Sequence, residues 1–275
     1  MLGGRLIKPV ARTILGERYI LAQSLWSQWC RQRPYYKDPV GISSIRRLRQ
    51  FKDIHKGERC VIIGNGPSLR KMDLSFLDSE IIFGLNRIYL LKQISEASLD
   101  YFVCVNPLVL KQFSNDIQNI PCPKFLSFRA YEYFQPQDNL LFLYSLSKWT
   151  FSTDITRGIC EGHTVTYVAM QIAFYMGFNE VVLIGVDHNF ESKGEPNKEI
   201  VMDRPDYSHF STDYFYRGVR WQLPDLENSE IAYRIAKVAY ERNGRRILDA
   251  TVDGQLNVFP KVDYIQYFNL KKTEG

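Results

Sequence analysis

The chain has 275 residues, of which 45% are hydrophobic, so it is long enough to bury one large α/β core. No apolar run approaches the ~20 residues that a membrane-spanning helix needs, and the N-terminus lacks a secretory h-region with a small-residue cleavage site. The five cysteines are odd in number and include no C-x-x-C pair, which favours buried free thiols in a reducing cytosol over a disulfide framework.

Positive charge is concentrated at the N-terminal end. Residues 1–52 carry 11 Lys and Arg against 2 acidic residues, a balance of +9, whereas the remainder carries 24 basic and 28 acidic residues, a balance of −4. The same region holds apolar residues that can share one helical face: Ile14, Leu15, Tyr19, Ile20, Leu21, Leu25 and Trp26. Such a helix suits an anionic membrane surface, although a helix packed on the domain with a solvated basic face fits the pattern equally well.

We therefore predict a basic amphipathic helical arm over residues 1–45. The protein is expected to be cytoplasmic, and peripheral at the inner face of the membrane if the arm binds lipid. Nucleic acid is not expected as a partner, because the rest of the chain lacks a basic surface signal.

Strand and helix patterns alternate after the arm. Apolar runs predict strands at residues 60–63, 81–85, 101–105, 124–128, 140–144, 181–186 and 246–250. The clearest helical stretches are residues 164–176 and 229–243, the second with Asn228 or Ser229 as its cap. Strands separated by helices imply right-handed βαβ units. We predict an α/β fold with a mostly parallel Rossmann-like sheet flanked by helices over residues 46–265, followed by a tail over 266–275.

The first predicted strand runs into the motif Gly64-Asn65-Gly66-Pro67-Ser68-Leu69. Pro67 is well placed to open a helix, so free backbone N–H groups and the positive helix end point at one place, where anions bind. The motif lacks the third glycine of the dinucleotide fingerprint, and no Gly-Lys-Ser/Thr follows, so it is not a P-loop. Asn65 and Ser68 can supply side-chain hydrogen bonds to a nucleotide or sugar phosphate; a tight turn without a ligand is the alternative.

Polar residues follow the other predicted strands as well. The second strand ends at Asn86, the third at Asn106, and a later one at Asp187 and His188. Ligands of such sheets bind outside the carboxyl ends of the strands. An amide offers both donors and an acceptor, which suits a nucleobase, a ribose and a phosphate, although each asparagine taken alone is a common turn residue.

Together these motifs resemble the bacterial branch of the 6-hydroxymethylpterin diphosphokinase MptE-like domain family. The resemblance runs from about residue 45 to residue 262, and the motifs that carry it are the Gly64 motif, Gly84-Leu85-Asn86, and residues 161–167, 176–190, 208–215 and 249–254. Members of this branch are often associated with surface-glycan or flagellin glycosylation, and the archaeal members transfer a diphosphate from ATP to a pterin.

The same motifs are similar to those of bacterial lipo-oligosaccharide sialyltransferases, which use CMP-sialic acid without a required metal. That similarity implies that Asn65, Asn86 and Asn106 contact the nucleotide. It also puts Gly162, His163 and Thr164 near the sugar- and phosphate-binding loop. Two tyrosines that hold the leaving phosphate in those enzymes have no counterpart here. Of their two histidines four residues apart, His209 matches the first, and Asp213 stands in place of the second, which is the base.

Glycosyl transfer needs a nucleotide cradle, a base for the acceptor hydroxyl, and charge stabilisation for the departing phosphate. His209 is the candidate base, and Asp213 is expected to orient it or replace it. His188 is the candidate partner of the phosphate, supported by Arg157 and the helix start at Thr164. The aromatic segment with Tyr207, Phe210, Tyr214, Phe215, Tyr216 and Trp221 is either a lid that contacts sugar or a loop packed on the core.

We expect no tightly bound metal, because the Asp-x-Asp and H-E-x-x-H patterns are absent. The leading function is a metal-independent glycosyltransferase of surface-glycan biosynthesis that takes a CMP-type sugar donor and a glycan or lipid-linked acceptor. The alternative is a pyrophosphokinase of a pterin-like alcohol, with Asp187 as ligand of an ATP-bound Mg²⁺. The third is a non-catalytic nucleotide-binding partner of another enzyme. The sugar, the linkage and the oligomeric state, including a homo-oligomer, stay open.

Overall fold

The structure, a computed structural model, describes Trp26 and residues 33–190, 194–203 and 206–270. Backbone contacts divide the chain into two units, Met1–Ser43 and Ser44–Gly275. Of the seven apolar residues assigned above to one helical face of the predicted arm, only Trp26 is described; the other six lie outside the described residues. Within the described part of the chain, no helix is both long and apolar enough to cross a membrane.

The second unit is built on a seven-stranded parallel sheet, which confirms the α/β prediction. Its strands are β1 (Arg59–Ile63), β2 (Ile82–Leu85), β3 (Tyr101–Cys104), β4 (Lys124–Ser127), β5 (Leu140–Leu143), β6 (Glu180–Ile184) and β9 (Arg246–Asp249). Each predicted strand appears within two residues of its expected ends. Nearly every strand residue is buried, as expected for a parallel sheet covered on both faces.

The strand order is β5-β4-β3-β2-β1-β6-β9. The chain first moves outward from β1 to β5, then returns to place β6 on the other side of β1. In the register, Ile63 of β1 lies opposite Gly84 of β2 and Ile184 of β6. The direction of winding therefore reverses between β1 and β6, and in open α/β sheets ligands bind beyond the carboxyl ends of the strands at such a point.

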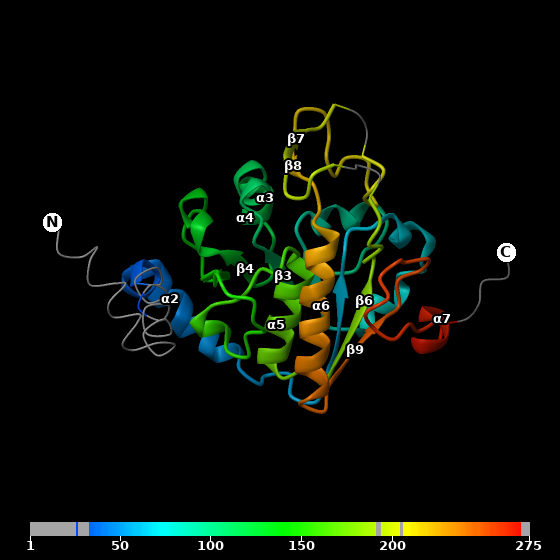
Figure 1. The fold of residues 1–275 in the computed structure, drawn as a ribbon, viewed down its shortest axis with the longest axis horizontal. Coiled ribbons are helices and arrows are strands. Elements are labelled where there is room, and N and C mark those ends of the chain that lie inside the picture. Colours follow the sequence, from blue (N-terminus) through cyan, green and yellow to red (C-terminus); the bar gives the residue numbers. More distant parts are fainter. Residues whose placement is uncertain (1–25, 27–32, 191–193, 204–205, 271–275) are drawn as a thin grey trace, which may run out of the picture. The chain divides into compact units, whose positions relative to one another are not determined.

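Two long helices, α5 (Val165–Met176) and α6 (Leu226–Glu241), lie side by side across one face of the sheet (Figure 1). Thr164 caps α5, and Gly177 ends it in a left-handed conformation with φ of 96°. Every residue from Thr166 to Met176 is buried. The reason is that α5 packs on the sheet with one face and contacts α6 and η6 with others. The Asp225 side chain caps α6 by accepting from the Asn228 N–H, so the sequence-based choice of Asn228 or Ser229 as the cap is wrong.

Short elements make the other connections. The helix expected from Pro67 is a five-residue 3₁₀ helix, η2 (Pro67–Lys71). The remaining ones are η1 (Arg49–Phe51), η3 (Ser75–Ser79), η4 (Ile88–Gln93), η5 (Phe128–Tyr133), η6 (Ile155–Arg157), α2 (Pro39–Leu48), α3 (Pro107–Gln112), α4 (Ser114–Gln118) and α7 (Tyr264–Tyr267). Right-handed crossovers put the β1-to-β5 connections on the face opposite α5 and α6.

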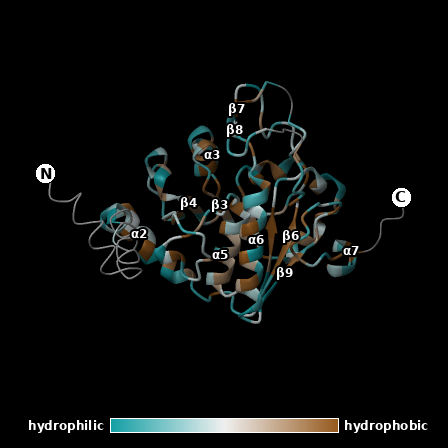
Figure 2. Ribbon diagram, viewed as in Figure 1, coloured by the Kyte–Doolittle hydropathy of each residue, from teal (hydrophilic) through white to brown (hydrophobic). Residues whose placement is uncertain are grey.

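A small antiparallel pair, β7 (Glu199–Val201) and β8 (Arg220–Gln222), was not expected from the sequence. It lies at the top of Figure 1, above the carboxyl ends of the strands. Figure 2 shows hydrophobic residues gathered on the strands of the large sheet, with hydrophilic residues on the outer turns. Cys60, Cys104, Cys122 and Cys160 are buried free thiols, as expected; Cys30 lies outside the described residues.

Candidate functional site

The loops after β1 and β6 touch each other at the reversal point. The Gly64 and Gly66 N–H groups donate to the Ile184 and Gly185 carbonyls, each at 2.8 Å. A Cβ on Gly66 would lie 1.7 Å from Asp187 Oδ2, and one on Gly64 would lie 2.2 Å from the Gly185 carbonyl oxygen. The glycines of the motif are therefore required by this close approach of two backbones.

Asp187 occupies the start of η2. Its Oδ1 accepts from the Ser68 N–H at 3.0 Å and its Oδ2 accepts from the Ser68 hydroxyl at 2.6 Å. Burial raises the pKa of this carboxyl, and the bonds from Ser68 oppose the rise. The anion at this helix start is thus Asp187 itself, which differs from the external phosphate that the sequence predicts.

Asn65 and Asn86 present buried amide oxygens at neighbouring strand ends. Asn65 Nδ2 donates to the Leu85 carbonyl at 3.0 Å, while the Oδ1 atoms of Asn65 and Asn86 are buried and accept no hydrogen bond from the described residues. Asn86 holds φ of 51°, a conformation that asparagine tolerates. Because buried acceptors without donors are rare and costly, these two oxygens mark a place where a ligand can donate.

Asn106, by contrast, is a helix cap. Its Oδ1 accepts from the N–H groups of Leu108 and Val109 at 2.9 and 3.3 Å, at the start of α3. The side-chain oxygen that the sequence assigns to a ligand is already used, which leaves the amide NH₂ as the part of Asn106 that can contact one.

His209 is held by a carboxylate and by aromatic rings. Its Nδ1 lies 2.6 Å from Asp206 Oδ2, and its ring stacks on Tyr214 with a centroid distance of 3.9 Å. The His209 and Asp206 side chains are only 9% and 2% exposed. The structure records no bond from a described residue to His209 Nε2.

The described residues record no hydrogen bond between Asp213 and His209, so the expected orienting contact is absent there, and the replacement of His209 by Asp213 as the base stays a prediction. The Asp213 carboxylate lies 3.4 Å from Gln93 Nε2. Asp206 is the partner instead, and the Asp206-x-x-His209 spacing was the sequence signal that could have found it.

Four contacts fasten the His209 segment to the two asparagine loops. The Phe210 N–H donates to the Asn65 carbonyl at 2.9 Å, and Arg70 Nε donates to the Phe210 carbonyl. Arg87, which follows Asn86, donates through Nη1 to the Asp213 carbonyl at 2.9 Å and to the carbonyl of Tyr214. The structure therefore brings His209 next to the ends of β1 and β2.

Arg87 was missed because nothing in the sequence distinguishes it from a solvated arginine. It is 4% exposed, and its guanidinium lies 3.8 Å from the centre of the Phe113 ring. The described residues give it no carboxylate partner; carbonyl oxygens, the Tyr89 hydroxyl and aromatic faces surround it instead.

The turn before α5 faces the start of α6. Gly162 and His163 have φ of 55° and 60°. His163 Nδ1 lies 3.2 Å from Asp225 Oδ2, and its ring stacks on Trp149 with a centroid distance of 5.5 Å. Thr164 Oγ1 lies 3.2 Å from the Tyr233 hydroxyl. The first turn of α5 holds no acidic residue, so its N–H groups keep a positive end for an anion.

His188 is held by α6. Its Nε2 lies 3.2 Å from Glu230 Oε1, and its side chain is 9% exposed. Arg157, at the end of η6, makes no recorded side-chain hydrogen bond with the described residues. The structure thus gives His188 a carboxylate neighbour, and the supporting role of Arg157 stays a prediction.

The aromatic segment is mostly packed. Phe210, Tyr214, Phe215 and Trp221 are buried, whereas Tyr207 and Tyr216 are 60% and 54% exposed. The segment is therefore a loop whose inner rings surround His209 and whose two outer rings face solvent.

No group of three or more His, Cys, Asp and Glu side chains among the described residues is arranged to hold a metal ion. Both oxygens of Asp187, the candidate Mg²⁺ ligand, already accept from Ser68. Each oxygen keeps a second lone pair, so among the described residues Asp187 is a single carboxylate ligand candidate at the reversal point.

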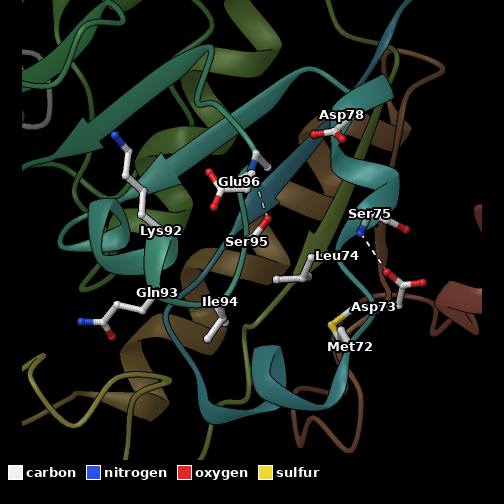
Figure 3. Close-up of a pocket in the computed structure, with 11 residues that line it drawn as sticks. Met72, Asp73, Leu74, Ser75, Asp78, Lys92, Gln93, Ile94, Ser95 and Glu96 are labelled. Atoms are coloured by element: carbon white, nitrogen blue, oxygen red, sulfur yellow. Dashed lines mark hydrogen bonds between the residues drawn. The ribbon is translucent and has the colours of Figure 1, made fainter.

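A pocket of about 560 Å³ is lined by residues that follow η2 and by residues at and after the end of η4, and none of the predicted nucleotide-binding residues is among them (Figure 3). Met72 and Leu74 line it with Asp78 and Glu96. Gln93, which also lines it, accepts from the Ser211 hydroxyl at 2.8 Å. The pocket thus adjoins the segment that carries His209.

Fold and site together define an α/β protein of Rossmann-like topology whose polar strand ends meet at a reversal of winding. The model for the family described as 6-hydroxymethylpterin diphosphokinase MptE-like matches residues 40–193, more than half of the chain. The protein belongs to this MptE-like family, which is named for a transferase of a diphosphate group.

Among curated proteins, no sequence matches this chain. Among solved structures, it is similar to the MAf glycosyltransferase from Magnetospirillum magneticum AMB-1, with 14% sequence identity and a TM-score of 0.47 over 88% of this chain. The chain spans 42% of the length of that protein.

Proposed function

We propose that this protein is a glycosyltransferase of surface-glycan biosynthesis that uses a nucleotide-activated sugar, CMP-linked by the resemblance described above. The observation that carries the proposal is that a hydrogen-bonded His–Asp pair lies beside two asparagines whose buried amide oxygens accept no hydrogen bond from the described residues. His209 is bonded to Asp206, and its neighbour Phe210 bonds to the backbone of Asn65. The Oδ1 atoms of Asn65 and Asn86 accept no hydrogen bond from the described residues.

In the proposed reaction, His209 Nε2 takes the proton of an acceptor hydroxyl as that oxygen attacks the anomeric carbon of the donor sugar. The sugar–phosphate bond breaks, and the nucleotide leaves with the bonding electron pair. Asp206 keeps the imidazole in one tautomer and stabilises the imidazolium that forms. The start of α5 and His188 are the proposed partners of the leaving phosphate. Nothing in this route calls for a metal.

The family supplies a second candidate, an ATP- and Mg²⁺-dependent pyrophosphokinase that acts on a pterin-like alcohol. It would use Asp187, whose two oxygens each accept one bond from Ser68, as a ligand of the ion through their remaining lone pairs. A non-catalytic nucleotide-binding partner of another enzyme is the third candidate, and it predicts that His209 and Asp206 are dispensable.

A ligand panel tests the proposal: thermal stabilisation by CMP, CDP, UDP, GDP, ADP and ATP, each with Mg²⁺ and with EDTA. A ligand at ~100 times its dissociation constant adds about 2.7 kcal/mol of stability. We expect CMP to stabilise the protein in EDTA, and Asn86→Gly to remove the effect. Glycine is the appropriate replacement because φ at this position is 51°.

Asn115→Gly, an exposed helical position in α4, is the matched control and should leave the CMP response intact. A response confined to ATP with Mg²⁺ would overturn the glycosyltransferase proposal and favour the pyrophosphokinase.

A further inference from the structure

A polar cluster lies at the ends of β4 and β5, apart from the asparagine loops. The Arg129 guanidinium and the Ser145 hydroxyl both donate to Glu161 Oε1, and Arg129 Nη2 lies 3.5 Å from Ser145 Oγ. Arg129 and Glu161 are 58% and 31% exposed, so both can contact a ligand from solvent. Glu161 directly precedes the turn that leads into α5.

Ser127 adds an independent observation. It ends β4 and stands at the N-cap position of η5, yet its hydroxyl makes no capping bond. The residue is 1% exposed, and its Oγ has no hydrogen-bond partner among the described residues. A buried hydroxyl without a partner costs stability. Contacts within the described residues do not explain the serine at position 127, whereas a bond from its hydroxyl to a ligand would.

Ser127 and the cluster share one side of the sheet. Phe125, two residues before Ser127, and Leu143, two residues before Ser145, both belong to the core beneath α5. Side chains alternate along a strand, so Ser127 and Ser145 extend from that same face. Ser127 lies directly opposite Leu143 in the register. Ser127 therefore lies on the same face as Ser145, at the end of the strand next to β5.

The position of the cluster fits one end of a nucleotide. Neighbouring strands lie ~4.8 Å apart, which separates the end of β4 from that of β2 by roughly 10 Å. The His209 segment is bonded to the loops after β1 and β2, so the reacting end of a donor belongs there. Helix α5, whose start suits a phosphate, contacts β1, β2 and β3. The base then extends toward β4 and β5.

We propose that Ser127, Arg129, Ser145 and Glu161 bind the base of the nucleotide and favour cytosine. The proposal rests on the nucleotide donor of the proposed function. A carboxylate such as Glu161 accepts from the exocyclic amine of cytosine, and a guanidinium such as Arg129 donates to a ring carbonyl. Uracil presents a carbonyl where cytosine has its amine, so Glu161 disfavours it.

The test is calorimetric titration of the full-length protein with CMP and UMP in EDTA. We expect the wild type to prefer CMP, and Glu161→Gln to lower the CMP-to-UMP affinity ratio about tenfold, because the glutamine NH₂ can donate to the uracil carbonyl. Glu132→Gln, an exposed glutamate on η5, is the matched control and should leave the ratio unchanged.

Ser127→Ala supplies a second readout that a structural role would not give. Removal of a partnerless buried hydroxyl should keep or raise the thermal stability of the free protein while CMP affinity falls. If CMP binds and both variants keep wild-type affinity for CMP and UMP, the base subsite is overturned while the proposed function stands. If no nucleotide binds the wild type, the proposed function itself fails and the base subsite fails with it.

Discussion

At the scale of single residues, buried polar groups divide into those that the fold satisfies and those that it does not. Asp187 receives two bonds from Ser68, and Arg87 finds carbonyls and aromatic faces. The amide oxygens of Asn65 and Asn86 receive none from the described residues. Groups of the first kind hold loops together, whereas groups of the second kind are candidates for ligand contact.

His209→Asn should lower turnover by about 10²–10⁴-fold, because general-base catalysis typically contributes that much. Asp206→Asn should also lower turnover, because the carboxylate that orients Nδ1 is lost. CMP affinity should stay within about twofold in both variants if Asn65 and Asn86 supply the nucleotide contacts. Initial rates measure turnover and calorimetry measures CMP affinity. An equal loss of CMP affinity would show that His209 binds the nucleotide and does not act as the general base.

Lys124 predicts a pH dependence of stability. Burial lowers the pKa of its ammonium to about 8, and Nζ donates to the Ile120 carbonyl at 2.5 Å. The unfolded chain keeps the ordinary value of 10.5, so between about pH 8 and pH 10.5 it binds more protons than the folded state. The contribution of Lys124 to stability therefore rises with pH across this window.

Urea denaturation of the wild type and of Lys124→Met from pH 7 to pH 11 isolates that contribution as a difference between two curves. The wild type should gain stability relative to the variant as pH rises. Parallel curves would show that Lys124 titrates at its ordinary pKa in the folded state.

At the scale of elements, the sequence was most informative where burial is complete. The seven strands of the large sheet are short apolar runs, and α5 lies between two capping signals, Thr164 and Gly177, so local pattern and tertiary environment agree. β7 and β8 were missed because each has three residues of mixed burial. The start of α6 was misplaced because Asn228 and Ser229 also fit the cap pattern, and only the fold selects Asp225.

The candidate site also has residues that the sequence pattern predicts and contacts that it does not predict. The strand-end asparagines follow from the pattern, because a parallel sheet gathers its carboxyl ends at one edge. The bonds of Arg87 to the backbone of residues 213 and 214 join segments 126 and 127 positions apart, and no local signal encodes them. Likewise, the engagement of Asp187 by Ser68 depends on β6 lying beside β1.

Gly66→Ala should destabilise the protein by about 1–3 kcal/mol, because the new methyl group would overlap Asp187 and force the β1 and β6 loops apart. Gly218→Ala is the control for a glycine with open space, since no atom lies within 4 Å of its added Cβ and only its φ of 95° opposes alanine. Denaturant midpoints compare the two. A Gly66→Ala loss no larger than that of the control would contradict the close contact of the loops.

At the scale of the whole molecule, the family match and the candidate base cover different parts of the chain. The match ends at residue 193, so it includes Asn65, Asn86, Asn106 and Asp187 but stops before Asp206 and His209. Family membership therefore bears on the polar strand ends. The match does not extend to the segment that carries the proposed base.

The uneven charge supports a separate proposal, that the basic arm binds anionic lipid. Removal of residues 1–32 keeps the described residues from Arg33 onward, including the buried Tyr35 and Leu48. The truncated protein should stay folded and lose binding to vesicles that contain phosphatidylserine, as co-sedimentation measures. Unchanged vesicle binding would contradict the membrane role of the arm.

The central claim is that His209 removes a proton from an acceptor of a nucleotide-linked sugar. Its most direct test is release of CMP from a panel of CMP-sugars in EDTA, with a lipid extract as acceptor source, by the wild type and by His209→Asn. We predict acceptor-dependent CMP release by the wild type, and its loss in a variant that still binds CMP. Full CMP release by His209→Asn, or turnover only of ATP with Mg²⁺ and a hydroxymethylpterin, would contradict it.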